Sequence, residues 1–334
     1  MQTQCKTIPC NGGRKPLINA SDSPDKCQIP FSNVCALLIV LSFSIFSLFS
    51  NVHAAQVSHL FDITSGNDKA LKLPSDVVVN SRGEIIIVDG GNHRVLVFTS
   101  KGKFSKEIGA TDPLDVRLQQ PLGIGIDAND QIYVVNKGKK RINIYHRKGK
   151  LLHSFETRNH QGLFVPVDVA VSADVKTILV TNNTHHQIAL FSNKGVYQAS
   201  WGKEGSNAEE FRYPATLVTD KQSNAYVVDV LNTQVKILNP NGSLQTTVAE
   251  WGVLPGQLFR PKGVALDDEG NIFVSDSYLN LVQIYAHNKK FQSVLSNPSG
   301  YQHFDSPTGL TIDQKRRLIV TEMRANKVSV FLLL

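Results

Sequence analysis

The chain has 334 residues, of which 41% are hydrophobic and 19% are charged, and its formal net charge is +7. This apolar content is enough for a large core and excludes a wholly disordered chain, while the modest charge permits acidic partners without demanding them. The body is dense in Val, Ile, Phe, Tyr and Thr with regularly spaced Gly and Asn, which excludes helix-rich classes and favours an all-β fold.

The cysteines are confined to the start of the chain. All four precede residue 36, and they are Cys5, Cys10, Cys27 and Cys35. Their spacing matches no zinc or haem motif, so we interpret them as reduced thiols in and beside a cytoplasmic leader over residues 1–33. From residue 55 onward there is no cysteine, which excludes a disulfide, a thiolate metal site and a cysteine nucleophile from the body.

Residues 34–50 form an uncharged apolar run. Val52 and Ala54 then occupy the −3 and −1 positions of a plausible signal-peptidase site before Ala55. The run is short for a membrane span of about 20 residues, and the positive charge before it favours a cytoplasmic N-terminus. Residues 34–54 are therefore a cleaved signal peptide, an uncleaved signal-anchor or, least favoured, a buried helix.

The first two alternatives export residues 55–334. The body would then be periplasmic or secreted, or anchored to the inner membrane by residues 34–50. A body without cysteine tolerates such a compartment without disulfide chemistry.

Six repeats follow the apolar run. A proline opens each one, at intervals of 45 to 48 residues: Pro74, Pro121, Pro166, Pro214, Pro261 and Pro307. The first repeat contains four short runs rich in β-branched and aromatic residues, separated by turn residues: Asp76–Val79, Glu84–Val88, Val95–Phe98 and Phe104–Ile108. Four antiparallel strands in a unit of this length are typical of one propeller blade. The sequence therefore predicts a six-bladed β-propeller over residues 55–334.

The two ends of this region predict how the ring closes. The repeats span about 74–120, 121–165, 166–213, 214–260, 261–306 and 307–334. The last one has only three strands: Thr308–Ile312, Arg317–Thr321 and Lys327–Leu332. An unassigned apolar run at residues 57–63 precedes the first repeat and supplies the missing outer strand. This pairing hides two strand edges and ties the ring shut.

Three phrases resemble NHL repeats: Pro-x-Gly-Val-Ala-Leu-Asp at Pro261–Asp267, Val-Asp-Gly-Gly-Asn-His-Arg-Val at Val88–Val95, and the Trp-Gly…Leu-Phe-x-Pro phrase at Trp251–Pro261. The resemblance covers residues 57–334 and implies a six-bladed NHL propeller. It implies no single function, because the family includes RNA-binding domains, sensor domains, protein scaffolds and an amidating lyase.

The loops between the second and third strands share one face of the ring with the blade-to-blade connections. Each begins with Asp, Asn or Glu, which we interpret as capping of tight turns rather than as metal ligands. The same loops carry His93, His185 and His186 and the cations Arg94, Lys137, Lys139, Lys140, Arg141, Arg324 and Lys327. This basic face is a solvated rim, a site for an anionic polymer or, least favoured, an RNA-binding face, since few aromatic residues are interleaved for base stacking.

The axial position, two residues after each proline, is occupied by Asp76, Gly123, Asp168, Thr216, Gly263 and Gly309. Glycine suits a crowded axis, and Asp76 and Asp168 depart from this pattern. The two carboxylates either bond to neighbouring backbone amides or, together with backbone carbonyls, hold a structural Ca²⁺ in the central channel. No other cofactor is expected.

The sequence supports the hypothesis of an enzyme less well than that of a binding module. The family's amidating lyase resembles a zinc enzyme with three histidines at the axis, whereas the histidines here fall in loops or outer strands: His93, His146, His153, His160, His185, His186, His287 and His303. No Gly-x-Ser-x-Gly elbow or phosphate-binding glycine loop occurs. A metal-dependent lyase or hydrolase remains the alternative to a non-catalytic module.

The loops after the second strands differ strongly between repeats, which favours one composite site over six equal ones. We expect an exported protein-binding or scaffold module whose partner is an envelope or extracellular protein. Leu231, Leu279 and Met323 would add apolar contacts to this surface. The expected binding residues are Arg94, Lys139, Lys140, Arg141, Tyr278 and Arg324.

Overall fold

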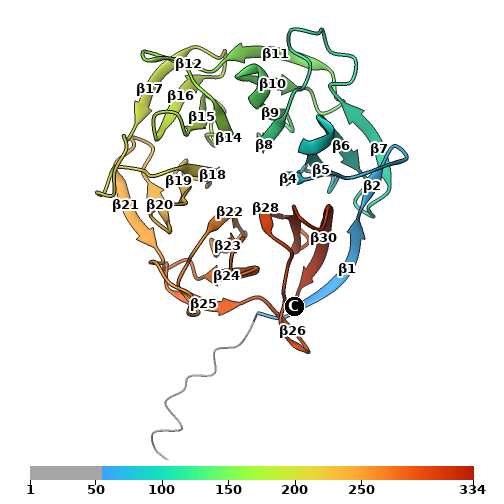
Figure 1. Cartoon of the computed structure of the whole chain (residues 1–334), viewed down its shortest axis with the longest axis vertical. Coiled ribbons are helices and arrows are strands. Elements are labelled where there is room, and N and C mark those ends of the chain that lie inside the picture. The colour runs from blue at the N-terminus through green and yellow to red at the C-terminus, as the bar shows by residue number, and fades with distance from the viewer. Residues whose placement is uncertain (1–54) are drawn as a thin grey trace, which may run out of the picture. The chain divides into compact units, whose positions relative to one another are not determined.

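The structure is a computed structural model that describes residues 55–334. The six repeats form six four-stranded antiparallel sheets that surround an axis as blades (Figure 1). The predicted all-β, six-bladed propeller is confirmed. The leader, the predicted signal or anchor segment and the four cysteines lie outside the described residues. Within residues 55–334, no helix is long and apolar enough to cross a membrane.

The blades follow the chain in order, each running from its innermost strand outwards. Blade 1 contains β4 (Pro74–Val79), β5 (Ile85–Asp89), β6 (Arg94–Phe98) and β7 (Phe104–Ile108). Blade 2 contains β8 (Pro121–Ile126), β9 (Ile132–Asn136), β10 (Arg141–Tyr145) and β11 (Leu151–Glu156). Blade 3 contains β14 (Pro166–Val171), β15 (Thr177–Asn182), β16 (Gln187–Ser192) and β17 (Tyr197–Trp201).

The second half of the ring repeats this order. Blade 4 contains β18 (Pro214–Thr219), β19 (Ala225–Asp229), β20 (Gln234–Leu238) and β21 (Leu244–Val248). Blade 5 contains β22 (Pro261–Leu266), β23 (Ile272–Asp276), β24 (Leu281–Tyr285) and β25 (Phe291–Val294). Blade 6 contains β28 (Pro307–Ile312), β29 (Arg317–Glu322), β30 (Lys327–Leu333) and β1 (Val57–Ile63).

Three two-stranded hairpins lie in blade-to-blade connections. They are β2 (Ser65–Gly66) with β3 (Lys69–Ala70), β12 (Arg158–Asn159) with β13 (Gly162–Leu163), and β26 (Ser296–Asn297) with β27 (Gly300–Tyr301). Two 3₁₀ turns, Gly90–Asn92 and Lys137–Lys139, follow β5 and β9.

The ring closes as predicted. β1 pairs antiparallel with β30, so that Val57 lies opposite Leu333 and Ile63 opposite Val328 (Figure 1). Val57 and Ile63 are 2% and 3% exposed. The N-terminal strand therefore completes the last blade and removes the open edge of β30.

The core lies between neighbouring blades. Second strands such as β5 and β9 are buried along their whole length, and their side chains on each face pack against the adjacent blade. Between blades 2 and 3, for example, the rings of Phe155 and Phe191 lie 5.0 Å apart. Burial on both faces explains why these strands read as continuous apolar runs.

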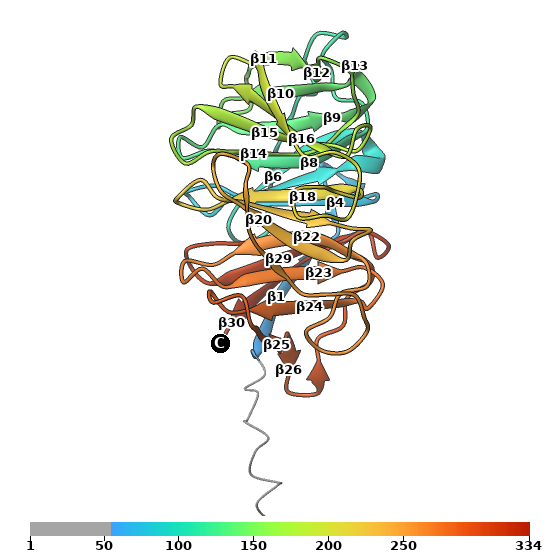
Figure 2. The same ribbon diagram turned by 90° about the vertical axis from the view of Figure 1, so that its left-hand side faces the viewer.

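Figure 2 shows the ring edge-on, with loops projecting at its two faces. We call one of them the connection face: it consists of the loops between second and third strands together with the blade-to-blade connections. In all six of these loops the residue before the third strand is left-handed, with φ between 52° and 58°: His93, Lys140, His186, Thr233, Asn280 and Asn326. The side chains of His93, His186, Asn280 and Asn326 reach the neighbouring connection from this position.

Candidate functional site

The Asp, Asn and Glu side chains at the ends of the second strands accept hydrogen bonds from backbone N–H groups, as predicted. Most of these N–H groups, however, lie far from them in the sequence and not in the same turn. Asp89 Oδ1 accepts a hydrogen bond of 2.7 Å from the Lys72 N–H in the preceding connection. The same bond, over the same 17 residues, joins Asn136 to Gln119, Asp229 to Arg212, Asp276 to Phe259 and Glu322 to Asp305. Local turn capping occurs beside it at Asp276 and replaces it at Asn182. These groups fix the connection face to the blades.

Two histidines of the connection face have a structural role. His93 Nδ1 accepts a hydrogen bond of 3.0 Å from the Gln120 N–H, and His186 Nδ1 accepts one of 2.9 Å from the Tyr213 N–H. Each bond links one blade to the connection that enters the next. The sequence indicated surface histidines but not this role.

Arg94 corrects the prediction of a continuous basic face. Its guanidinium is buried, and its Nε donates to Asp89 Oδ2 at 2.7 Å. Its two terminal nitrogens donate to the carbonyls of Gly66 and Lys69, each at 3.0 Å. The β2–β3 hairpin therefore covers Arg94, which holds the hairpin in place instead of facing a ligand.

Arg141 is also largely committed within its own blade. It donates to the hydroxyl and the carbonyl of Ser154 and lies 3.6 Å from Glu156. Lys139 and Lys140 are exposed, and the Arg324 side chain is 78% exposed at 3.9 Å from Asp305. Tyr278 is 58% exposed.

The expected binding residues do not gather into one site. Lys139 and Lys140 belong to blade 2, whereas Tyr278 belongs to blade 5 on the opposite side of the ring (Figure 1). Arg324, in blade 6, is the one exposed cation of this set in a blade adjacent to that of Tyr278. The grouping of Tyr278 with Lys140 in one composite site is therefore wrong, because the second and fifth of six consecutive blades lie opposite each other in a closed ring.

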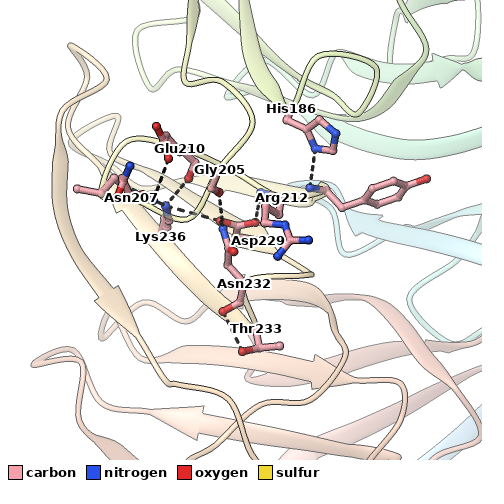
Figure 3. A network of polar contacts seen from close by, with 11 residues as sticks. His186, Gly205, Asn207, Glu210, Arg212, Asp229, Asn232, Thr233 and Lys236 are labelled. Atoms are coloured by element: carbon pink, nitrogen blue, oxygen red, sulfur yellow. Dashed lines mark hydrogen bonds and ion pairs between the residues drawn. The ribbon is translucent and has the colours of Figure 1, made fainter. Parts of the chain in front are cut away.

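A buried lysine organises the connection into blade 4 (Figure 3). Lys236 is 1% exposed, and its ammonium donates to the carbonyls of Asn207 and Ala208 at 2.8 and 3.1 Å and to that of Glu210. Asp229 Oδ2 lies 3.6 Å away. Burial lowers the pKa of Lys236 and raises that of Asp229, so hydrogen bonds to carbonyls, more than attraction between charges, hold this site together.

In two other blades, a neutral side chain at the equivalent position of the third strand also hydrogen-bonds the backbone of the preceding connection. Asn143 Nδ2 donates to the Val116 carbonyl at 2.7 Å, and Gln283 Oε1 accepts from the Gly256 N–H at 2.8 Å. The third residue of the third strand thus anchors the preceding connection in blades 2, 4 and 5. These residues share one register in the repeat, but their types differ, so no common motif marks them in the sequence.

Aromatic side chains gather on the connection face over blades 4 and 5. The Phe259 ring lies 4.2 Å from that of Tyr278, at 31°, and 6.4 Å from that of Trp251. Trp251 is 68% exposed. We call Trp251, Phe259 and Tyr278 the aromatic surface. Of the three, only Tyr278 is predicted from the sequence as a binding residue, because Trp251 and Phe259 belong to the repeated Trp-Gly…Leu-Phe-x-Pro phrase.

A cavity of about 510 Å³ occupies the axial mouth on the same face. Its wall contains the residue that follows each opening proline: Ser75, Leu122, Val167, Ala215, Lys262 and Thr308. Its rim contains residues that directly follow second strands: Lys137, Asn183, Val230, Ser277 and Met323. The repeat register that identified the axial position also specified these two sets.

Asp76 lies at the floor of this cavity, and both Asp76 and Asp168 line a smaller one of about 170 Å³ beneath it. Asp76 accepts from the N–H groups of Val77 and Ile124, each at 2.9 Å, and Asp168 Oδ2 accepts from that of Leu217 at 2.9 Å. Added Cβ atoms at Gly309 and Gly123 would collide with Asp76 and Asp168. The glycines therefore make room for the two carboxyl groups.

The two axial carboxyl groups repel each other when both are ionised. Burial raises the pKa of Asp76 to about 7, and burial together with repulsion from Asp76 raises the pKa of Asp168 well above its usual range. Asp168 Oδ1 is buried and has no hydrogen-bond partner among residues 55–334. A proton on one of the two groups would remove this repulsion.

This arrangement fits the expected calcium ion poorly. Ca²⁺ takes six to eight oxygen ligands, whereas three of the four carboxylate oxygens here already accept backbone N–H groups. In the described part of the chain, no group of three or more His, Cys, Asp or Glu side chains is placed to hold a metal. The geometry favours the alternative of carboxylates bonded to backbone amides.

Comparison with protein families finds one match. The model of the NHL repeat matches residues 71–98, which span the first three strands of blade 1. The chain carries an NHL repeat in a six-bladed β-propeller. The resemblance seen in the sequence is thereby confirmed.

Two curated proteins are similar to this NHL propeller. "Protein brain tumor" of Drosophila melanogaster is 28% identical over 140 residues, which is 41% of this chain and 13% of that protein. Human "E3 ubiquitin-protein ligase NHLRC1" is 22% identical over 144 residues, 40% of this chain and 35% of that protein. The similarity thus spans a minor part of each relative.

Solved structures agree on the fold. A streptogramin B lyase superposes with a TM-score of 0.56 at 16% identity, covering 77% of this chain and 78% of that one. A Bacteroides thetaiotaomicron protein of unknown function superposes with a TM-score of 0.62 at 11% identity, covering 83% and 76%. At these identities the likeness concerns the propeller architecture alone.

Proposed function

We propose that this NHL propeller is a protein-binding module whose connection face docks a partner on the aromatic surface. The main support is that the rings of Trp251, Phe259 and Tyr278 lie in a row, with Trp251 and Tyr278 more than half exposed. Exposed aromatic groups at a rigid surface are typical binding hot spots.

The aromatic surface is held in place before any partner arrives. Asp276, buried at the end of β23, accepts hydrogen bonds from the N–H groups of Phe259 at 2.7 Å and of Tyr278 at 3.0 Å. One carboxylate therefore orders both loops that carry the aromatic rings. Preorganisation of this kind lowers the entropy cost of binding. The proposal of a protein partner is also consistent with the similar human protein, which by its name is a ubiquitin-protein ligase and so acts on proteins.

Affinity capture with matched variants tests the proposal. A Trp251→Ala, Tyr278→Ala double variant should capture at least about tenfold less partner than the parent, because hot-spot side chains each contribute about 2 kcal/mol or more to the binding free energy. Val196→Ala is the matched control, since Val196 is 63% exposed in the loop between β16 and β17 on the opposite face. Equal capture by the double variant and the control would reject the aromatic surface.

The rival is polyanion binding at blade 2. Lys137, Lys139 and Lys140 are exposed in one loop and form no ion pair among residues 55–334. Binding that disappears in about 0.5 M salt, where the Debye length is only a few ångströms, and that is lost in a Lys139→Glu, Lys140→Glu variant, would favour this second function. Binding through the aromatic surface should survive both changes.

We also propose that the partner is met outside the cytoplasm, in the envelope or the extracellular space. The support is the apolar run at residues 34–50 followed by the Val52–Ala54 cleavage pattern. N-terminal sequencing of protein from the envelope or secreted fraction should begin at Ala55 for a cleaved signal and near Met1 for an anchor. Recovery of the full chain from the cytosol would overturn the proposal.

A further inference from the structure

The face opposite the connection face carries its charge unevenly (Figure 2). It consists of the loops between first and second strands and the turns between third and fourth strands, and we call it the turn face. In blades 1–3, the turns between third and fourth strands contain six exposed cations, which we call the basic rim: Lys101, Lys103, Arg147, Lys148, Lys150 and Lys194. These turns, at residues 99–103, 146–150 and 192–196, contain no Asp or Glu.

The three turns share one geometry, which sets their cations at equivalent places. Gly102, Gly149 and Gly195 are left-handed, with φ of 75°, 93° and 76°, and the N–H of each donates to the carbonyl three residues earlier. The residue before each glycine is a lysine. The lysine therefore occupies the same position at the tip of three successive blades.

Hydrogen bonds between blades join these turns into one continuous surface. Lys106, in the outer strand of blade 1, donates from its ammonium to the Arg147 carbonyl of blade 2 at 3.1 Å. His153, in the outer strand of blade 2, donates from Nε2 to the Lys194 carbonyl of blade 3 at 3.2 Å. The basic rim is therefore ordered before any partner arrives, which lowers the entropy cost of binding.

The charge of the basic rim is not compensated within residues 55–334. None of its six side chains forms an ion pair there, and the pairs in neighbouring loops join Arg82 to Glu84 and Lys176 to Asp174. A group of exposed like charges without counter-charges attracts anions. The basic rim is thus suited to an extended anionic partner that contacts several turns at once.

Apolar side chains beside the cations indicate which kind of anionic partner fits. Phe104 and Leu152 follow the turns of blades 1 and 2, and they are 38% and 48% exposed. Cations combined with exposed apolar side chains are typical of surfaces that bind the interface of an anionic bilayer. A hydrated anionic polymer would use the cations but would gain little from the apolar groups.

The place where the chain enters the ring also favours a bilayer. Ala55 lines a cavity of about 700 Å³ together with Asp267, Asp268 and Glu269, which belong to the loop between β22 and β23 on the turn face. Only residues 51–54 separate Ala55 from the apolar run at residues 34–50. A chain anchored by that run would therefore bring the turn face to the bilayer.

We propose that the basic rim binds an anionic lipid bilayer, with its cations at the lipid headgroups and Phe104 and Leu152 at the boundary of the acyl region. The connection face then points away from the membrane and is free to bind a partner. The charges and apolar groups of the basic rim carry this proposal, and none of them belongs to the aromatic surface.

Vesicle binding of the full chain tests the role of charge. Phosphatidylcholine vesicles with about 30% phosphatidylglycerol should bind at least about thirtyfold more tightly than phosphatidylcholine alone, because each lysine near an anionic surface contributes about fivefold. The apolar run at residues 34–50 acts on both kinds of vesicle, so the ratio of the two affinities measures the charge. Hydrogen exchange should show protection of the three turns only with the anionic vesicles.

Charge-matched variants locate the surface. Lys148→Gln, Lys150→Gln should lower the affinity ratio by about fivefold or more. Lys69→Gln, Lys72→Gln is the matched control, since both lysines are exposed in the connection into blade 1 and their loss changes the net charge equally. This control should keep the ratio of the parent. Melting temperatures of both variants confirm that they are folded.

A neutral substitution distinguishes a bilayer from an anionic polymer. Leu152→Ser removes an apolar contact but no charge, so it should weaken binding to the anionic vesicles by about threefold or more and leave heparin binding unchanged. If Leu152→Ser leaves vesicle binding unchanged while Lys148→Gln, Lys150→Gln abolishes heparin binding, the ligand is an anionic polymer and the bilayer proposal is wrong.

Three other results would also overturn the proposal: equal affinity for the two kinds of vesicle, protection that falls outside the three turns, or equal effects of the two lysine variants. The Trp251→Ala, Tyr278→Ala variant should bind anionic vesicles as the parent does, because the aromatic surface lies on the connection face. Failure of the proposed protein docking would therefore leave these measurements unaffected.

Discussion

Asn326 Oδ1 accepts a hydrogen bond of 2.8 Å from the Leu73 N–H, although 253 residues separate them. The bond joins the last blade to the connection that enters the first. His93, His186 and Asn280 make the same bond between consecutive blades. The ring is therefore closed by the same contact that links three other pairs of blades, in addition to the pairing of β1 with β30.

Asn326→Ala should lower the melting temperature by about 2–4 °C, because a partly exposed hydrogen bond contributes about 1 kcal/mol. Asn129→Ala is the control, since Asn129 is exposed and its side chain makes no hydrogen bond within residues 55–334. Thermal unfolding followed by circular dichroism measures both. Indistinguishable melting of the two variants would show that the Leu73–Asn326 bond contributes nothing to closure.

Deletion of residues 55–66 should destabilise the ring sharply, because β30 would lose its outer neighbour. A finer test uses two residues of β1. Ile63→Ala should cost about 2–4 kcal/mol, since the side chain is 3% exposed, whereas Leu60→Ala should cost less than about 0.5 kcal/mol, since Leu60 is 43% exposed. Denaturant unfolding gives both values. Equal effects would contradict the observed register of β1.

Lys236→Met should cost about 3–5 kcal/mol, because it leaves three partly buried carbonyls without their donor and the buried Asp229 carboxylate without its neighbouring cation. Lys236→Gln should be milder, since Gln283 holds the equivalent connection in blade 5. Hydrogen exchange should show the loss of protection concentrated in residues 203–213. Parent-like stability of Lys236→Met would mean that the connection does not depend on this ammonium.

Asp168→Asn should remove most of the pH dependence that the axial pair confers. The raised pKa values mean that the folded protein holds more protons than the unfolded chain above about pH 4, so the free energy of unfolding falls as the pH rises through about 7. Asn retains an acceptor for the Leu217 N–H and a donor toward Asp76.

The melting temperature of Asp168→Asn should match the parent at about pH 5 and exceed it by several degrees at about pH 8. Asp76→Asn is the contrast, since Asp76 accepts two N–H groups and an amide can accept only one of them. An excess of calcium should leave the parent's melting unchanged. Strong stabilisation by calcium, or a less stable Asp168→Asn at about pH 8, would show that the pair holds an ion.

Local sequence patterns were sufficient to predict the propeller. Strand periodicity, turn residues and the proline interval are local properties, and six copies of them specified the blades and their number. The three strands of the last repeat left one strand to be supplied by residues 57–63, so even the closure followed from counting. The same register placed Asp76 and Asp168 at the axis.

Which side chains are available to a partner depends on contacts between segments that lie far apart in the sequence. Arg94 and Lys139 both occupy loops or loop ends of the connection face, yet a hairpin from the preceding connection covers Arg94 and nothing covers Lys139. Asp76 raises the pKa of Asp168 at the axis although 92 residues separate them, and Lys236 is buried because a connection wraps over it. Burial and charge depend on what distant segments bring to a residue, and a local repeat pattern carries no information about them.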